Sequence, residues 1–278
     1  MFIRTWGSRG SIPVSGKQYN KYGGDTTCIE LISNDGELVI IDAGSGIRTL
    51  GNRLKKEGPR RLNLLLTHMH LDHVSGFPFF KPNYGDGFII DIMGPSNGEV
   101  LKKGISTLMS SPFFPITHDA LEAKIEYHSI ASEVFSIGSL KIKTIPLNHT
   151  DSGFGYRFEE DGKSFVFLTD NELNLGYPNG RKFEDYVKFA EGADILFHDA
   201  EYTPAEYKHT RGWGHSIYQD AVELGIKANV KTLGLFHHNQ DRDDKSLDGI
   251  LLDSKKIISE ANSKMKCIAV ATGTEIKI

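Results

Sequence analysis

Four side chains that can bind a metal fall within six residues of the sequence, in the run 68–73 (HMHLDH). Imidazole nitrogens and carboxylate oxygens are the ligands that zinc and similar metals prefer. The run directly follows the apolar segment 62–66, which is typical of a β-strand, so we expect it to begin a loop. A loop can turn these side chains toward two adjacent points, and packing gives no reason for so dense a cluster. The run therefore predicts a metal site.

Three more polar side chains follow predicted strands. His149 comes after the strand-like run that begins at residue 140, Asp170 after 164–168, and His237 after 232–236. Binding sites on sheets are commonly assembled at the carboxyl ends of strands. Each residue taken singly can be an ordinary hydrogen-bonded or exposed group. Their shared placement favours a single site that also includes the run 68–73.

The elements that must position these residues alternate along the chain. Short apolar runs predict strands at 2–6, 28–33, 38–41, 62–66, 89–93, 124–128, 140–145, 155–159, 164–168, 195–197, 232–236 and 267–270. Helical spacing predicts helices at 47–56, 99–109, 183–190, 217–228 and 246–261. We find no internal repeat and no low-complexity linker, so we expect one domain spanning residues 1–278. Strand clusters capped by helices suggest two packed sheets between helical layers.

The order of these motifs resembles the metallo-β-lactamase superfamily: an H-x-H-x-D-H run, a distant His, an Asp and a final His. The segment 38–46 (LVIIDAGSG) resembles the early strand and Asp-Gly motif of that family. Within the superfamily the chain is most similar to the phosphodiesterase branch, which includes tRNA 3′-processing endonuclease and cyclic-phosphate phosphodiesterases. The supporting segments are 7–13 (GSRGSIP), 198–200 (HDA) and 214–216 (GHS). The resemblance covers nearly the whole chain and implies an α/β fold, a four-layer αββα sandwich.

The resemblance also implies a ligand assignment for two divalent metal ions. Zinc is the first expectation, with manganese and iron as alternatives. One metal is expected to be bound by His68, His70 and His149, and the other by Asp72, His73 and His237. Asp170 is expected to bridge the two, together with a water or hydroxide.

Two residues are candidates for a direct catalytic role. Two metals roughly 3.5–4 Å apart can clamp a phosphodiester and supply a hydroxide as the attacking group near neutral pH. Asp72 can orient that hydroxide, and His215 can contact the phosphate or protonate the leaving oxygen. The alternative for His215 is an ordinary polar residue at a helix start. Asp42 and Asp199 are candidates for carboxylates that fix the ligand imidazoles.

These expectations lead to a metal-dependent hydrolase, specifically a phosphodiesterase acting on a small cyclic nucleotide or cyclic phosphate. The first alternative is a tRNA 3′-end endonuclease. That family usually carries a protruding arm that grips tRNA, and no long basic insertion is evident here. A second alternative is a lactone or thioester hydrolase, since the same metals can polarise a carbonyl. A third is a metal-binding or redox protein without hydrolysis.

The composition of the chain bears on its partners and its location in the cell. The 278-residue chain has a formal net charge of −4, which gives no overall attraction to nucleic acid or anionic membranes. Neither a signal peptide nor an apolar run long enough to cross a membrane is evident, so we expect a cytoplasmic protein without a membrane partner. Cys28 and Cys267 are expected to be buried thiols. The aromatic segments 77–80 and 111–115 predict either an apolar wall that stacks a nucleobase or packing in the core or a homodimer interface.

Overall fold

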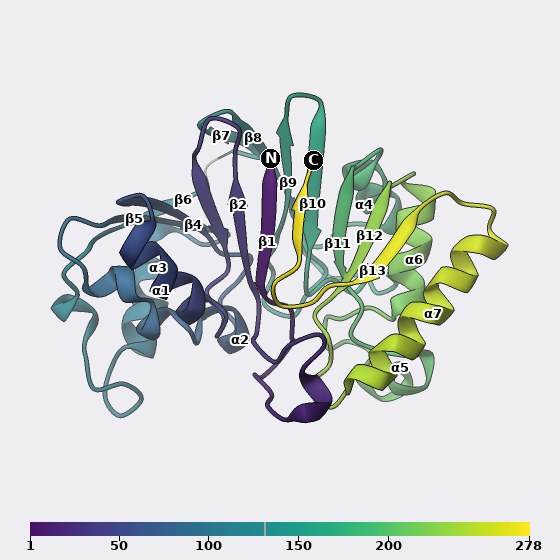
Figure 1. Cartoon of the computed structure of the whole chain (residues 1–278), viewed down its shortest axis with the longest axis horizontal. Helices are drawn as coiled ribbons and strands as arrows, with labels where there is room; N and C mark the ends of the chain where they lie inside the picture. The colour runs from purple at the N-terminus through teal and green to yellow at the C-terminus, as the bar shows by residue number, and fades with distance from the viewer. Residues whose placement is uncertain (131) are drawn as a thin grey trace.

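The computed structural model describes residues 1–130 and 132–278, whose strands form two seven-stranded sheets (Figure 1). The first sheet has the order β14-β1-β2-β3-β4-β5-β6, with bounds Glu275–Lys277, Phe2–Gly7, Cys28–Ile32, Leu38–Ile41, Arg61–Leu65, Ile89–Gly94 and Lys124–Ser129. The second has the order β13-β12-β11-β10-β9-β8-β7, with bounds Lys266–Ala269, Thr232–Phe236, Ile195–Asp199, Lys163–Leu168, Phe154–Glu160, Leu140–Pro146 and Val134–Ile137.

Helices cover the outer faces of both sheets (Figure 1). The first sheet carries α1 (Ile47–Glu57) and α3 (Gly98–Leu108). The second carries α4 (Phe183–Ala190), α6 (Tyr218–Lys227) and α7 (Asp244–Glu260). Two shorter helices, α2 (Leu71–Val74) and α5 (Pro204–Thr210), lie at the end of the sandwich away from the chain termini.

Three apolar clusters hold the layers together. One joins α1 and α3 to the outer face of the first sheet, through residues such as Leu50 and Ile92. Another joins α4, α6 and α7 to the outer face of the second sheet. The third lies between the sheets and is rich in aromatic rings, including Phe165 and Phe197. The predicted αββα four-layer sandwich is therefore confirmed.

The parallel parts of the two sheets aim their carboxyl ends at one end of the sandwich. Strands β3 to β6 run parallel in the first sheet, and β10 to β13 run parallel in the second. The run 68–73 leaves β4 at this end. The sequence predicted a loop here, but the second half of the run forms the single helical turn α2. Four residues are too few to show a helical period in the sequence.

Most predicted elements agree with the structure to within one or two residues at their ends. The sequence reading missed β7, β14 and α5, which are short elements of three to seven residues. Cys28 and Cys267 are free and buried, as predicted. In the part of the chain that the structure describes, we find no helix long and apolar enough to cross a bilayer.

Candidate metal centre

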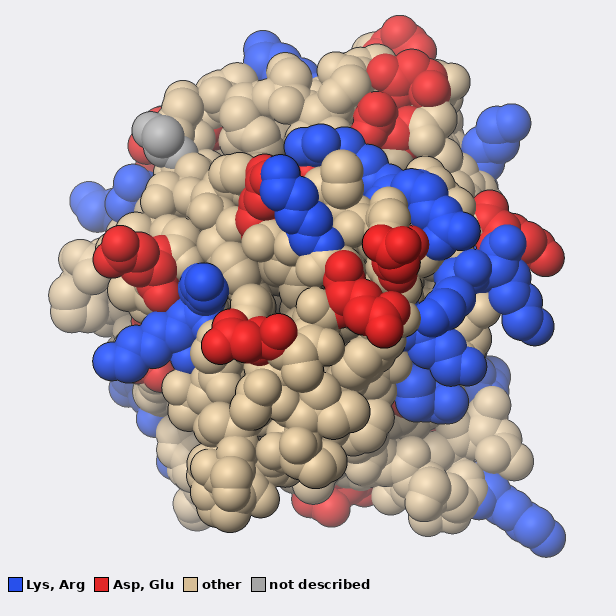
Figure 2. Space-filling model, turned by 90° about the vertical axis from the view of Figure 1, so that its left-hand side faces the viewer, with Lys and Arg blue, Asp and Glu red and all other residues tan. Residues whose placement is uncertain are grey.

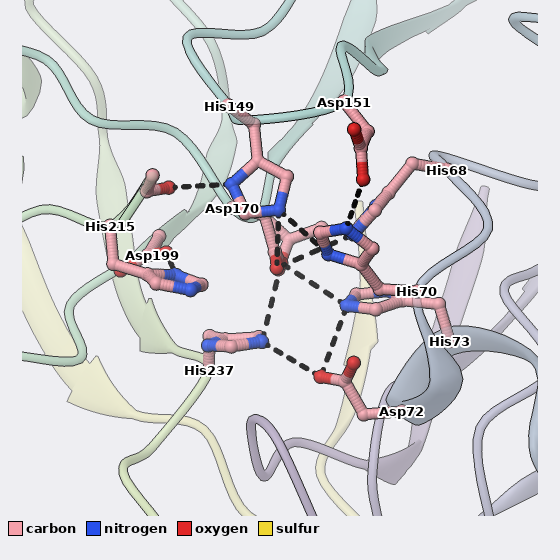
Figure 3. A network of polar contacts seen from close by, with 12 residues as sticks. His68, His70, Asp72, His73, His149, Asp151, Asp170, Asp199, His215 and His237 are labelled. Atoms are coloured by element: carbon pink, nitrogen blue, oxygen red, sulfur yellow. Dashed lines mark hydrogen bonds and ion pairs between the residues drawn. The ribbon is translucent and has the colours of Figure 1, made fainter. Parts of the chain in front are cut away.

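The structure brings all seven predicted ligands to one place (Figure 3). They form two groups that share Asp170, and the candidate ligand atoms within each group lie within 4.8 Å of one another. The first group is His68, His70, His149 and Asp170, and the second is Asp72, His73, Asp170 and His237. This is the division that the resemblance implies, and the shared aspartate lies where a bridging ligand is required.

Three strand ends place site residues in an uncommon backbone conformation. Asp42, Asp170 and His237 follow β3, β10 and β12, with φ values of 61°, 51° and 56°. Side chains other than glycine adopt this left-handed region rarely, at a cost of about 1–3 kcal/mol each. Such strain persists where the surroundings impose it. The same conformation at three converging strand ends is typical of a functional site.

The spacing of the donor atoms suits a four-coordinate metal. In the second group, His73 Nε2 lies 3.3 Å from Asp72 Oδ2 and 3.2 Å from Asp170 Oδ1. His237 Nε2 lies 3.1 Å and 3.3 Å from the same two oxygens. Tetrahedral ligands at zinc bond lengths are separated by about 3.3 Å. The first group is less regular, because His68 Nε2 and His149 Nε2 lie 3.6 Å and 3.7 Å from Asp170 Oδ2.

All five predicted ligand imidazoles have a polar partner at the ring nitrogen that faces away from the centre; for His68 this partner is the Thr67 hydroxyl, 3.1 Å from Nδ1. His73 Nδ1 donates to Asp42 Oδ2 at 2.8 Å, and His237 Nδ1 donates to Glu201 Oε2 at 2.9 Å. A ligand histidine typically donates its second N–H in this way, which fixes the ring and leaves the other nitrogen free for the metal. The contact of Asp42 agrees with its predicted role, and Glu201 is a partner that the sequence reading missed.

The other two contacts involve the first group. His149 Nδ1 donates to the Gly214 carbonyl at 3.1 Å, and His70 Nε2 donates to Asp151 Oδ2 at 2.9 Å. These bonds leave His149 Nε2 and His70 Nδ1 facing each other at 2.9 Å. Two unprotonated ring nitrogens repel at this distance unless a proton or a cation lies between them. The pair therefore fits a shared metal ion.

Buried ring nitrogens without a hydrogen-bond partner also indicate a site for a cation. Among the described residues, His68 Nε2 and His73 Nε2 are buried and lack a hydrogen-bond partner, although each is aimed at the cluster. The site also contains five buried carboxylates: Asp42, Asp72, Asp170, Asp199 and Glu201. In the described part of the chain, their ion pairs are all with histidines and never with lysine or arginine. Burying five negative charges without cations is strongly unfavourable. Divalent ions and protonated histidines are the groups that can supply the compensating positive charge.

The electrostatics divides the histidines into two kinds. Burial holds the pKa of His68 well below its usual range and lowers that of His149 to about 4, so both rings are neutral and available as ligands. Burial acts in the same direction on His73 and His237. There the neighbouring carboxylates, Asp170 foremost for His237 and Asp72 for His73, outweigh burial and raise the pKa well above the usual value. The second group therefore attracts positive charge, whether protons or metal ions.

His215 lies beside the ligand cluster. Its ring stacks on that of His237 with centroids 4.8 Å apart, and its Nδ1 donates to Asp199 Oδ2 at 2.6 Å. Burial disfavours the charged ring, but Glu201 and Asp199 prevail and raise its pKa to about 9. These carboxylates favour the protonated form of His215, which is the form that a proton donor must have. The prediction for Asp199 needs correction in one respect, because the imidazole that it fixes is the one we assigned as proton donor and not one of the seven ligands.

Two glycines allow close approach to ligand rings. A Cβ added to Gly10 would lie 2.2 Å from His237 Cε1, and one added to Gly214 would lie 1.9 Å from His149 Nδ1. These glycines belong to the segments 7–13 and 214–216 that carried the resemblance. Any larger residue at either position would overlap a predicted ligand imidazole, which explains why glycine is found at both.

The aromatic segments divide between core and surface. Phe77 and Phe80 are fully buried in the cluster under α1 and α3, which corresponds to the core alternative. Phe79 and Phe113 are more than half exposed, and Phe79 packs edge-to-face on Phe114. A wall for a nucleobase or a dimer contact at these exposed rings stays a prediction.

Comparison with known proteins agrees with this geometry. Residues 38–238 match a family model described as a beta-lactamase superfamily domain. The chain therefore belongs to the beta-lactamase superfamily and is a metal-dependent hydrolase of the metallo-β-lactamase fold.

Individual relatives are distant. A curated relative, ribonuclease Z of Picrophilus torridus, is 24% identical over 92% of this chain and 90% of that protein. Among solved structures, the metallo-β-lactamase fold protein YhfI from Bacillus subtilis has a TM-score of 0.72 at 14% identity, covering 99% of this chain and 98% of that one. A diphosphatase of the PhnP family has a TM-score of 0.67 at 18% identity, covering 100% of this chain and 97% of that one. At these identities the structural matches establish the fold.

Proposed function

We propose that this protein is a phosphodiesterase that uses two divalent metal ions. The observation that carries the proposal is the pair of ligand groups sharing Asp170, with the ring of His215 stacked on His237 beside them. When bound, two such ions polarise a phosphodiester and activate a water as nucleophile. Zinc is the proposed metal, because the site combines five imidazoles with two carboxylates.

The protein's own residues supply orientation and proton transfer. Asp72 Oδ2 accepts a hydrogen bond from the Ser11 N–H at 2.8 Å, which holds this carboxylate at the entrance to the second group. His215 Nδ1 is occupied by Asp199, so Nε2 is the nitrogen from which a proton can pass to the leaving oxygen. The Asp199 carboxylate stabilises the charged ring before that transfer.

We propose a small cyclic nucleotide or cyclic phosphate as the substrate. The described helices and strands pack into the sandwich without a long protruding arm (Figure 1). Over the face that Figure 2 shows, Lys and Arg side chains are interspersed with Asp and Glu. The net charge of −4 agrees with a small substrate.

A second candidate is a tRNA 3′-end endonuclease. The name ribonuclease Z, shared by the curated relatives, favours it. The two candidates use the same metal centre and differ only in what binds around it. A lactone or thioester hydrolase remains the alternative if no phosphodiester is cleaved.

The test is a substrate panel with purified, metal-loaded protein. We expect cleavage of bis(p-nitrophenyl) phosphate and of cyclic nucleotides in preference to a precursor tRNA. His68→Ala should abolish cleavage. His128→Ala, which changes a half-exposed histidine on β6 outside the two groups, should not. Preference for precursor tRNA would select the second candidate, and metal binding without any phosphodiester cleavage would refute the proposal.

A further inference from the structure

Large apolar side chains are exposed on three separate segments next to the metal centre. Leu71, 63% exposed, lies between His70 and Asp72 in sequence. Ile12, 57% exposed, follows the residue whose N–H binds Asp72. Trp213, 60% exposed, directly precedes Gly214 and His215. Exposed apolar groups on segments that adjoin a functional site are candidates for a ligand-binding rim.

The backbone that carries Trp213 is held from inside the protein. The buried carboxylate of Glu172 accepts hydrogen bonds from the Gly212 N–H at 2.9 Å and the Gly214 N–H at 2.9 Å, the two residues that flank the tryptophan. The hydroxyls of Tyr177 and Tyr207 also donate to Glu172, each at 2.6 Å. The turn is therefore fixed before a ligand arrives, so binding at the indole ring requires little further ordering.

The same turn is tied to the metal centre. The Gly214 carbonyl accepts the N–H of His149, and His215 is the next residue. Trp213 thus directly precedes Gly214, whose carbonyl holds the proposed ligand His149, and lies two residues before the proposed proton donor, His215. A substrate whose phosphate lies at the centre places its remaining parts over such neighbouring segments.

Positive charge accompanies the ring. The segment 208–213 (KHTRGW) ends α5 and leads into the turn, and Lys208 and Arg211 are both exposed. Within residues 1–130 and 132–278, neither makes an ion pair with an acidic side chain. An aromatic face combined with unpaired cations is the combination that binds a nucleobase and its phosphates.

We propose that Trp213 is a stacking platform for the nucleobase of the substrate, with Lys208 and Arg211 favouring the approach of an anionic ligand to this turn. This inference rests on the proposed phosphodiesterase function and narrows it to phosphodiesters that carry a base. Glu172 is the positioning residue, because it holds the two N–H groups on either side of the ring.

Direct binding is measured by tryptophan fluorescence. The chain has two tryptophans, Trp6 and Trp213, so Trp213→Ala leaves Trp6 as an internal reference. We expect saturable quenching by AMP in the metal-loaded wild type, no quenching by ribose 5-phosphate, and loss of AMP quenching in Trp213→Ala. Absence of AMP quenching in the wild type, or quenching that persists in the variant, would overturn the inference.

Kinetics provides the second measurement. In Trp213→Ala, kcat/KM for 2′,3′-cyclic AMP should fall roughly 5- to 100-fold, the range expected for loss of one stacked base. The value for glycerol 1,2-cyclic phosphate, which has no base, should stay unchanged. Trp213→Phe should retain most of the activity. Leu252→Ala, which removes a still more exposed apolar group from α7, should have no effect. Equal losses on both substrates would overturn the inference. If neither substrate is cleaved while AMP still quenches, the proposed function fails and the base site stands.

Discussion

Gly10 lies against the ring of His237, and adding a single methyl group there tests the metal centre sharply. In Gly10→Ala the new Cβ would lie 2.2 Å from Cε1 and 2.3 Å from Nδ1 of that ring. Because carbon atoms in contact are separated by about 3.5 Å, one side must move by roughly 1.3 Å. Gly10 is not among the residues with positive φ, so the effect is purely steric.

The ring should move, because the backbone at Gly10 is firmly held. The Gly10 N–H donates to the His238 carbonyl at 3.0 Å, and the next N–H, that of Ser11, binds Asp72. Arg9 is fully buried, with its guanidinium bonded to the carbonyls of Gly23, Asn239 and Arg242. A proposed ligand displaced by more than 1 Å exceeds the tolerance of about 0.2 Å in metal–ligand distances.

The expected result is loss of the metal in the second group. Affinity there should fall by at least the roughly 10- to 100-fold that accompanies loss of a hydrogen bond supporting a ligand. The assay is metal content per chain by mass spectrometry after gel filtration, together with bis(p-nitrophenyl) phosphate cleavage. Gly176→Ala is the matched control, because its added Cβ meets no atom within 4 Å. A folded Gly10→Ala protein that keeps both metals and full activity would refute the reasoning.

Four other predictions follow from the same contacts. Asp199→Asn should lower the pKa of His215 from about 9, so the alkaline limb of kcat/KM against pH should move to lower pH; an unchanged limb would contradict the assigned proton donor. In the wild type, charged His215 should stabilise the folded protein fully below its ordinary pKa of 6.5, and this stabilisation should disappear as pH rises through about 9. Thermal unfolding across that pH range measures it. Asp42→Asn should weaken metal binding roughly 10- to 100-fold in competition with a chelator, because Asp42 orients His73. Removal of the metals with a chelator should lower Tm, and their return should restore it, whereas an unchanged Tm would exclude tight binding to the folded state.

Much of the metal centre could be predicted from the sequence, because its ligands fall in recognisable places. The run 68–73 is dense enough to stand out, and His149, Asp170 and His237 each follow an apolar strand. What could not be predicted is how the strand ends aim the side chains. The left-handed backbone at Asp42, Asp170 and His237 depends on the packing of both sheets, and no local residue pattern indicates it.

The supporting carboxylates were harder to find. Glu201 lies two residues beyond Asp199 at the end of β11, where alternate residues share a face, so this spacing was an available signal. Asp151 and Glu172 lie in loops and contact their partners only through the tertiary fold. The helix α2 was missed because one turn has no period to detect, although it positions both Asp72 and His73.

Titration of the metal-free protein with zinc, with metals bound and bis(p-nitrophenyl) phosphate cleavage followed on the same sample, tests the central claim most directly. The two ligand groups predict that cleavage rises until two ions are bound per chain and then stays constant. A protein that binds two ions at these groups and cleaves no phosphodiester, or that is fully active with its second group empty, would contradict the account.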